Sequence, residues 1–220
     1  ENLSKNQILN RGLIFKAVDG GYKVGEEDYK QFGAIYKDKD IIIGYEKDDE
    51  NPDSGKPITK KYTIINAKAI DGGPSNIDTE KNIVGTESLK LENGILTYGD
   101  FQTINISPEK GYILNGITNT LKISGENNEL NNSVINAYGT AVVFGEGNKQ
   151  LTLSGTIVNG GIDESDPNTK GIAISGSNNG DTLILQSGKV EYTINGEKKS
   201  ATQNTIVNGN IDMGGGDDTL

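Results

Sequence analysis

Thr63-Ile64-Ile65-Asn66-Ala67 is the first of several related pentapeptides in this 220-residue chain. Each has a hydroxyl residue, two aliphatic residues, Asn, and then Gly or Ala. Close copies start at residues 133, 156 and 205, weaker copies at 90 and 112, and a degenerate copy without Asn at 182. The starts are separated by 27, 22, 21, 23, 26 and 23 residues. A repeat of this length is typical of a solenoid, in which each repeat adds one coil to a stack.

The residues between these copies indicate short strands separated by turns. Runs of four β-forming residues at 121–124, 141–144, 151–154 and 172–175 are bounded by Gly, Asn and Asp. A second phrase, a Gly/Asn/Asp turn followed by Leu, ends at residues 130, 151, 183 and 220. Three strands of about five residues with short turns need roughly 21–24 residues per coil. The spacing therefore predicts an all-β fold, a parallel β-helix, over residues 61–220, with coils of about 21–27 residues.

The Asn of the phrase has a physical role in this fold. At equivalent corners of successive coils, Asn side chains would lie about 4.8 Å apart and bond along the axis as an amide ladder, with the aliphatic residues stacked beside them. The alternative is an antiparallel sandwich in which Asn-Gly marks hairpin turns. Hairpin signals alone do not produce a fixed period, so we favour the β-helix.

Residues 1–60 lack the phrase and carry four of the nine Tyr, at positions 22, 29, 36 and 45. We expect strands at 13–15 and 41–43, a short helix over residues 25–36 and a charged loop over 48–57. The segment is predicted to be an N-terminal cap or an inserted subdomain, because the open end of a stack needs cover. Since the chain begins at Glu1 and ends inside a repeat-like phrase, we expect a piece of a longer protein, truncated at its C-terminus, with any signal peptide or anchor outside it.

Composition narrows the chemistry. The chain has no His, no Cys and a single Arg (Arg11), so the commonest general base, thiolate sites and bidentate anion clamps are missing. A net charge of −10 argues against nucleic-acid partners, and no apolar run is long enough to insert in a membrane. Residues 214–220 resemble one copy of a calcium-binding nonapeptide, but such sites need stacked copies, so we expect a surface turn. We expect no catalysis, no cofactor and no metal. An enzyme would require two close carboxylates, or Asp with Lys, in one cleft.

Residues 205–220 and 176–185, together with the Ile/Asn/Lys-rich composition, resemble passenger domains of large Gram-negative type V autotransporter adhesins, of the fusobacterial RadD-like type. The resemblance covers about residues 61–220. It implies a right-handed β-helix that is exported to the outer-membrane surface and that adheres to host cells or other bacteria.

The function expected is therefore a non-catalytic, monomeric cell-surface adhesin fragment with a protein or glycan receptor. A structural stalk, or a polysaccharide lyase or hydrolase on a β-helix scaffold, are the alternatives. The sequence identifies no partner-binding residue. Contacts are expected where the phrase is interrupted or absent, at residues 47–61, 161–171 and 196–203 and in the Tyr-rich N-terminal segment, where Tyr residues could instead pack in the core.

Overall fold

The computed structural model describes residues 15–18, 20–46, 55–68, 88–161 and 171–220. All regular elements in these ranges are strands, and no helix capable of crossing a membrane occurs among them. The N-terminal strands are β1 (Phe15–Val18), β2 (Gly21–Val24) and β3 (Glu27–Tyr29), which form a small antiparallel sheet, followed by β4 (Ile35–Tyr45). The fold is therefore all-β, as the sequence predicts.

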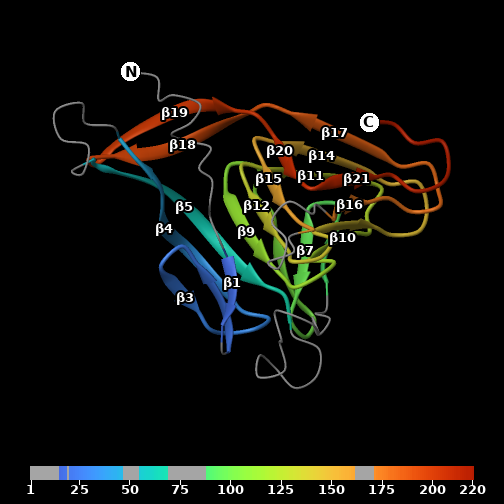
Figure 1. Cartoon of the computed structure of the whole chain (residues 1–220), viewed down its shortest axis with the longest axis horizontal. Helices are drawn as coiled ribbons and strands as arrows, with labels where there is room; N and C mark the ends of the chain where they lie inside the picture. Colours follow the sequence, from blue (N-terminus) through green and yellow to red (C-terminus); the bar gives the residue numbers. More distant parts are fainter. Residues whose placement is uncertain (1–14, 19, 47–54, 69–87, 162–170) are drawn as a thin grey trace.

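Five strands that carry the repeated phrase form one parallel stack. They are β5 (Pro57–Asn66), β9 (Gly111–Asn115), β12 (Val134–Asn136), β15 (Ile157–Asn159) and β20 (Ile206–Asn208), each paired in parallel with the next. Figure 1 shows β9, β12, β15 and β20 side by side along the molecule. The antiparallel hairpin of β18 (Gly188–Ile194) and β19 (Glu197–Gln203) and the long strand β4 join the same sheet through β5. We call this the asparagine sheet.

The chain visits two further sheets between these strands. One contains the parallel series β6 (Leu89–Glu92), β10 (Leu121–Ile123), β13 (Val142–Phe144), β16 (Ile172–Ser175) and β21 (Asn210–Asp212), extended by the antiparallel strands β7 (Ile95–Tyr98) and β8 (Gln102–Asn105). The other contains the parallel strands β11 (Asn127–Asn131), β14 (Gln150–Ser154) and β17 (Thr182–Gln186). The triplets β9–β11, β12–β14 and β15–β17 each pass through the three sheets in the same order.

The predicted amide ladder is present in the asparagine sheet. Each side-chain Nδ2 donates to Oδ1 of the Asn in the preceding strand of the stack, at 3.2, 3.0, 3.0 and 2.7 Å in order. The ladder is formed by Asn66, Asn115, Asn136, Asn159 and Asn208. Its members are separated by 49, 21, 23 and 49 residues, so two regular coils lie between two long ones.

Two copies of the phrase do not belong to the ladder. Asn93 and Gly94, with φ of 46° and 84°, form the turn of the β6–β7 hairpin, because both positions of such a tight turn need a left-handed backbone. The degenerate copy at 182–186 is β17, which is in register with β14 rather than with the phrase-bearing strands. The spacings measured to the copies at 90 and 182 are therefore not steps of the ladder, which advances by 21 and 23 residues in the two regular coils and by 49 residues in the other two steps.

The hydroxyl of the phrase forms a second ladder that the sequence analysis did not anticipate. The backbone N–H of Tyr112 donates to Ser133 Oγ at 3.0 Å, that of Ser133 to Thr156 Oγ1 at 3.3 Å, and that of Thr156 to Thr205 Oγ1 at 3.2 Å. These hydroxyls satisfy donors where each strand begins, which is why Ser or Thr opens the close copies.

The two aliphatic residues of the phrase face opposite sides of the asparagine sheet. The second, as in Ile65 and Leu114, packs in the core that the three sheets share. The first, as in Ile64 and Ile113, belongs to a second buried cluster on the outer face, together with side chains of β2, β3, β4 and β18 such as Tyr29. Because both faces of this sheet are buried, two consecutive residues of the strand are apolar, whereas a sheet with one solvent-exposed face would alternate apolar and polar residues. Burying each such side chain contributes about 1.5–3 kcal/mol.

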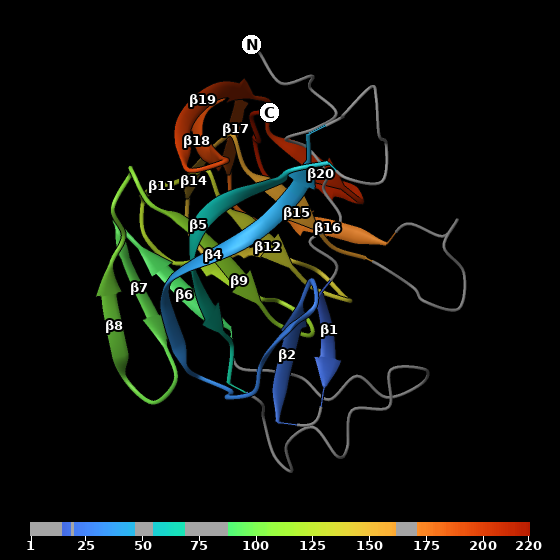
Figure 2. The same cartoon turned by 90° about the vertical axis from the view of Figure 1, so that its left-hand side faces the viewer.

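The N-terminal segment differs from the prediction in one element. The helix expected over residues 25–36 is absent, and the region holds β3 and the start of β4. Gly25 and Gly33 have φ of 61° and 68°, which end the strands in turns and break a helical path. β4 pairs along β5 and covers the outer edge of the stack, as Figure 2 shows. The predicted boundary between an N-terminal cap (residues 1–60) and the coils (residues 61–220) falls inside β5, and this division into two parts stays a prediction.

Candidate functional site

A pocket opens where two strands separate from β5. The register with β9 begins at the pair Tyr62–Gly111, and the register with β18 begins at Thr59–Thr193. Lys60 and Lys61 lie between these pairs. On the edge of β5 that faces β9 and β18, neither of these two strands is paired with them, whereas β4 pairs with them on the opposite edge. The divergence of β9 and β18 thus produces a fork in the asparagine sheet.

The cavity at this fork has a volume of about 440 Å³, within the size range of small-molecule sites. Its walls come from β4, β5, the β18–β19 hairpin and the loop before β9. We call it the fork pocket, and it is lined by Asp38, Asp40, Thr59, Lys60, Lys61, Thr63, Pro108, Glu109, Lys110, Gly111, Asn132, Lys189, Glu191, Tyr192, Thr193 and Lys198.

Five lysines and four carboxylates line the fork pocket, which is an excess of positive charge on a chain whose net charge is −10. Two of the lysines have partners: Lys61 lies 3.1 Å from Asp40, and Lys110 lies 3.9 Å from Asp38. Both pairs are exposed and contribute little to stability. The other three lysines form no ion pair within the described residues.

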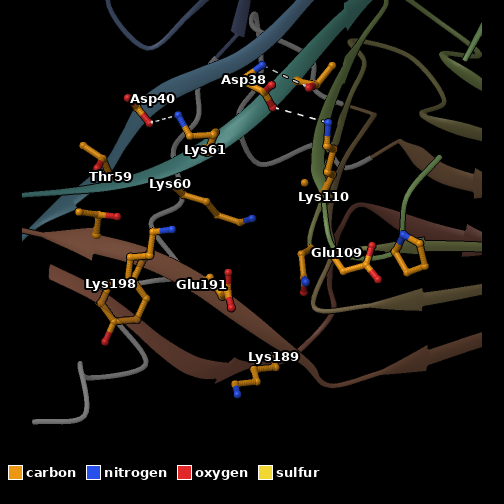
Figure 3. A pocket seen from close by; sticks show the side chains of 16 residues that line it. Asp38, Asp40, Thr59, Lys60, Lys61, Glu109, Lys110, Lys189, Glu191 and Lys198 are labelled. Carbon is orange, nitrogen blue, oxygen red and sulfur yellow. Dashed lines mark hydrogen bonds and ion pairs between the residues drawn. The ribbon is translucent and has the colours of Figure 1, made fainter. Parts of the chain in front are cut away.

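Lys60 is the central residue of the pocket. Alternation along β5 places it on the same face as Ile58 and Tyr62, and only 7% of its surface is exposed. Its Nζ lies 4.5 Å from the centre of the Tyr62 ring, a cation–π distance, and it makes no hydrogen bond with the described part of the chain. Figure 3 shows the side chain reaching from β5 across the gap between β18 and residues 108–111.

The environment of Lys60 changes its protonation. Burial, which disfavours the charged ammonium, lowers its pKa from 10.5 to about 8, and the negative charge of Glu191 opposes this effect. The ammonium is therefore still the main form at pH 7, but it can be neutralised within the mildly alkaline range. A buried charge with no close protein partner is costly, and such groups are frequent in binding and catalytic sites.

Gly111 creates the space that the ammonium occupies. A Cβ added at this position would lie 2.6 Å from Lys60 Nζ and 2.7 Å from the backbone oxygen of Asn132. Any side chain here would collide with both groups, so the start of β9 is glycine where the lysine passes.

The predicted contact regions have different outcomes. In the predicted region 47–61, residues 59–61 line the fork pocket, and in the predicted region 196–203, Lys198 lines it. Residues 47–54 and 162–170 of the predicted regions lie outside the described residues. Tyr22 and Tyr29 are buried in packing clusters, while Tyr45 is 59% exposed.

Sequence reasoning missed the contribution of Lys189, Glu191 and the loop at 108–111. Alternation in the run 188–194 could have indicated a strand, but nothing in the sequence shows that it pairs with β5.

The carboxylates of the repeat phrases serve as turn acceptors. Asp181 is fully buried, and its Oδ2 accepts from the backbone N–H and the hydroxyl of Ser177, both at 2.8 Å. Asp218 Oδ1 accepts from the backbone N–H of Asp181 at 2.8 Å. These bonds explain Asp at such corners by local turn chemistry.

The fork pocket itself combines Asp, Glu and Lys, the cluster that an enzyme would require, so the expectation of a non-catalytic protein stays a prediction.

Comparisons of the chain with models of protein families, with curated proteins and with solved structures give no match.

Proposed function

We propose that this chain is a fragment of an adhesive cell-surface protein, built as a right-handed parallel β-helix and binding its receptor in the fork pocket. The ordered passage of the chain through three sheets and the amide ladder support the β-helix. Its handedness, its export to the outer-membrane surface and its attachment to host cells or other bacteria follow from the resemblance to autotransporter passengers. The receptor is a protein or a glycan, and the fragment acts as a monomer without catalysis.

One observation carries the binding role: the buried ammonium of Lys60, which has no ion-pair or hydrogen-bond partner in the described chain, faces a pocket. Two of the elements that form this pocket, β4 and the β18–β19 hairpin, are additions to the repeating coils. A stack that served only as a spacer has no need of a buried cation, because an apolar side chain would stabilise it better. A ligand that supplies the missing partner would give this residue a purpose.

The proposal is tested by binding the labelled chain to host epithelial cells and to bacterial cells. An unrelated acidic protein of similar size serves as the negative control, since a net charge of −10 affects non-specific binding. We expect saturable binding above this control, and a weaker signal for Lys60→Met than for Lys61→Met. Binding no greater than that of the control protein would exclude an adhesive role for this chain and leave the structural stalk as the preferred function.

A second candidate, an enzyme acting on an anionic polysaccharide, is favoured by the proximity of Lys60 and Glu191 and by the lowered pKa of the lysine. An amine of this kind can serve as a general base near neutral pH. Release of unsaturated or reducing ends from uronate-containing polysaccharides would support this candidate. Absence of release at enzyme concentrations that saturate cell binding would exclude it.

A further inference from the structure

We propose that the fork pocket binds a sugar residue that carries a carboxylate, with the carboxylate against Lys60 and the sugar hydroxyls against the threonine-lined walls. This inference rests on the proposed binding function and names its ligand class. It follows from the charge, the depth and the lining of the pocket, which are considered in turn.

The charge distribution favours an anion. Asp38 forms an ion pair with Lys110, and Asp40 forms one with Lys61. Glu109 accepts a hydrogen bond from the hydroxyl of Ser107. Lys60, Lys189 and Lys198 remain without an ion pair in the described chain, and Glu191 is the carboxylate that acts on Lys60. Three lysines without an ion pair thus face the cavity together with two carboxylates, Glu109 and Glu191, which leaves a net positive charge.

The form of the cation favours a carboxylate over a phosphate group. The deepest donor is the single ammonium of Lys60 on β5, whereas Lys189 and Lys198 lie at exposed positions of the β18–β19 hairpin. Phosphate sites typically combine several backbone N–H groups or the planar fork of Arg, and the described residues that line the pocket include no Arg. One buried ammonium is matched by one monoanionic carboxylate.

The remaining lining favours a sugar as the body of the ligand. Thr59, Thr63 and Thr193 contribute hydroxyls that both donate and accept, which suits the hydroxyls of a pyranose ring. Thr63 Oγ1 already accepts from the backbone N–H of Asp38, whereas a purely apolar acid would remove water from the half-buried Thr59 and Thr193 hydroxyls without replacing its hydrogen bonds, which is costly. The carbons of Pro108 supply apolar surface for the C–H face of a sugar.

The test is titration of the folded chain with glucuronic acid and with N-acetylneuraminic acid, followed by calorimetry or by NMR of the backbone amides. Glucose and N-acetylglucosamine are the neutral controls, and acetate and inorganic phosphate are the charge-only controls. We expect at least one acidic sugar to bind at least tenfold more tightly than every control compound.

Variants locate the site. Lys60→Met is expected to weaken binding about tenfold or more, as the loss of a charge-assisted hydrogen bond does. Lys30→Met, which removes an exposed lysine that is paired with Asp28 at 3.5 Å and does not line the pocket, should change affinity by less than about twofold. Lys198→Ala, at an exposed position of β19, tests the pocket should Lys60→Met not fold, and should weaken binding about two- to fivefold.

Affinity should also fall as the pH rises from 7 to 9.5, because Lys60 loses its proton near pH 8. Several charged or titratable groups face it from the elements packed around it. These groups are Asp38, Asp40, Lys61, Tyr62, Glu109, Lys110, Lys189, Glu191, Tyr192 and Lys198. Affinity that does not change over this pH range would contradict the role of Lys60.

The remaining outcomes of the titrations and of the cell-binding assay decide between the sugar ligand and the adhesive function. Equal binding of acetate or phosphate would reduce the site to an anion site and overturn the sugar, and binding of neither acidic sugar would overturn the inference. Cell binding that persists without competition by acidic sugars refutes the ligand and leaves the adhesive function standing. Acidic-sugar binding without cell binding refutes the adhesive function and leaves the ligand standing.

Discussion

The two regular coils and the two long coils of the asparagine sheet use their side chains differently. Between Asn115 and Asn159 the ladder advances in steps of 21 and 23 residues, and the side chains of the phrase are occupied by stacking. The steps from Asn66 to Asn115 and from Asn159 to Asn208 take 49 residues each, and they contain the loop at 108–111 and the β18–β19 hairpin that line the fork pocket. The regular coils therefore hold the stacked ladder, and the long steps contain insertions that border the fork pocket.

The largest expected effect concerns the interior of the ladder. Asn136 is fully buried, donates to Asn115 and accepts from Asn159. Asn136→Ala would leave Asn115 Oδ1 without a donor and Asn159 Nδ2 without an acceptor, and it is expected to lower the free energy of unfolding by about 2–4 kcal/mol. Urea denaturation measures the loss. Asn208→Ala, at the exposed end of the ladder, is the matched control and should cost less than about 1 kcal/mol. Equal losses would show that the ladder adds nothing beyond its individual bonds.

The fork pocket should behave in the opposite way, because Lys60, which precedes the ladder on β5, is a buried cation without an ion-pair partner in the described chain. Lys60→Met keeps the aliphatic stem and removes a buried charge, so it should raise the free energy of unfolding at pH 7 by about 1–3 kcal/mol.

The advantage of this variant should shrink with pH. The folded-state pKa of Lys60 is about 8 and the unfolded value is 10.5, so the unfolded chain binds more protons between these values. The wild-type chain should therefore gain stability relative to Lys60→Met as the pH rises from 8 to 10. Parallel stability curves for the two proteins would contradict the buried, charged state of Lys60.

The hydroxyl ladder gives a smaller effect within the regular coils. Thr156 Oγ1 accepts from the backbone N–H of Ser133 and donates to the carbonyl of Leu130 or Ser154. Thr156→Val preserves shape and should lower the free energy of unfolding by about 1–2 kcal/mol. Thr205→Val, at a more exposed position, should cost less than half of this. A neutral Thr156→Val would show that water or a backbone shift satisfies the Ser133 N–H.

The smallest effect is expected at the rim of the fork pocket. Asp40 and Lys61 form an exposed pair at 3.1 Å. Asp40→Asn should change the free energy of unfolding by less than about 0.5 kcal/mol in thermal or urea melts, and the change should vanish in high salt. A loss above 1 kcal/mol would mean that this rim is structural.

The sequence was informative where one residue type has one physical role. Asn followed by a small residue predicted the amide ladder, because stacked amides need the same residue at each level. The same Asn-Gly pair at positions 93 and 94 forms a hairpin turn, since its backbone preference serves both structures equally well.

The fork pocket could not be derived from the sequence, because it depends on non-local pairing. In the sequence, Lys60 is one Lys in a charged stretch. In the structure its side chain is enclosed in the pocket that forms where β9 and β18 separate from β5. The contact of Nζ with Gly111 joins residues 51 positions apart, and no local pattern records it.

The central claim is that strands one coil apart lie in parallel register, and disulfide trapping tests it most directly. The chain has no cysteine, so pairs can be introduced without interference. Glu129 on β11 and Thr152 on β14 are register partners at accessible positions, and adjacent strands bring Cα atoms within disulfide reach. The Glu129→Cys, Thr152→Cys protein should form an intramolecular disulfide under mild oxidation. Glu129→Cys with Gln150→Cys, two residues out of register, should not. Equal oxidation of both pairs, or none in the first, would contradict the stacked-coil architecture.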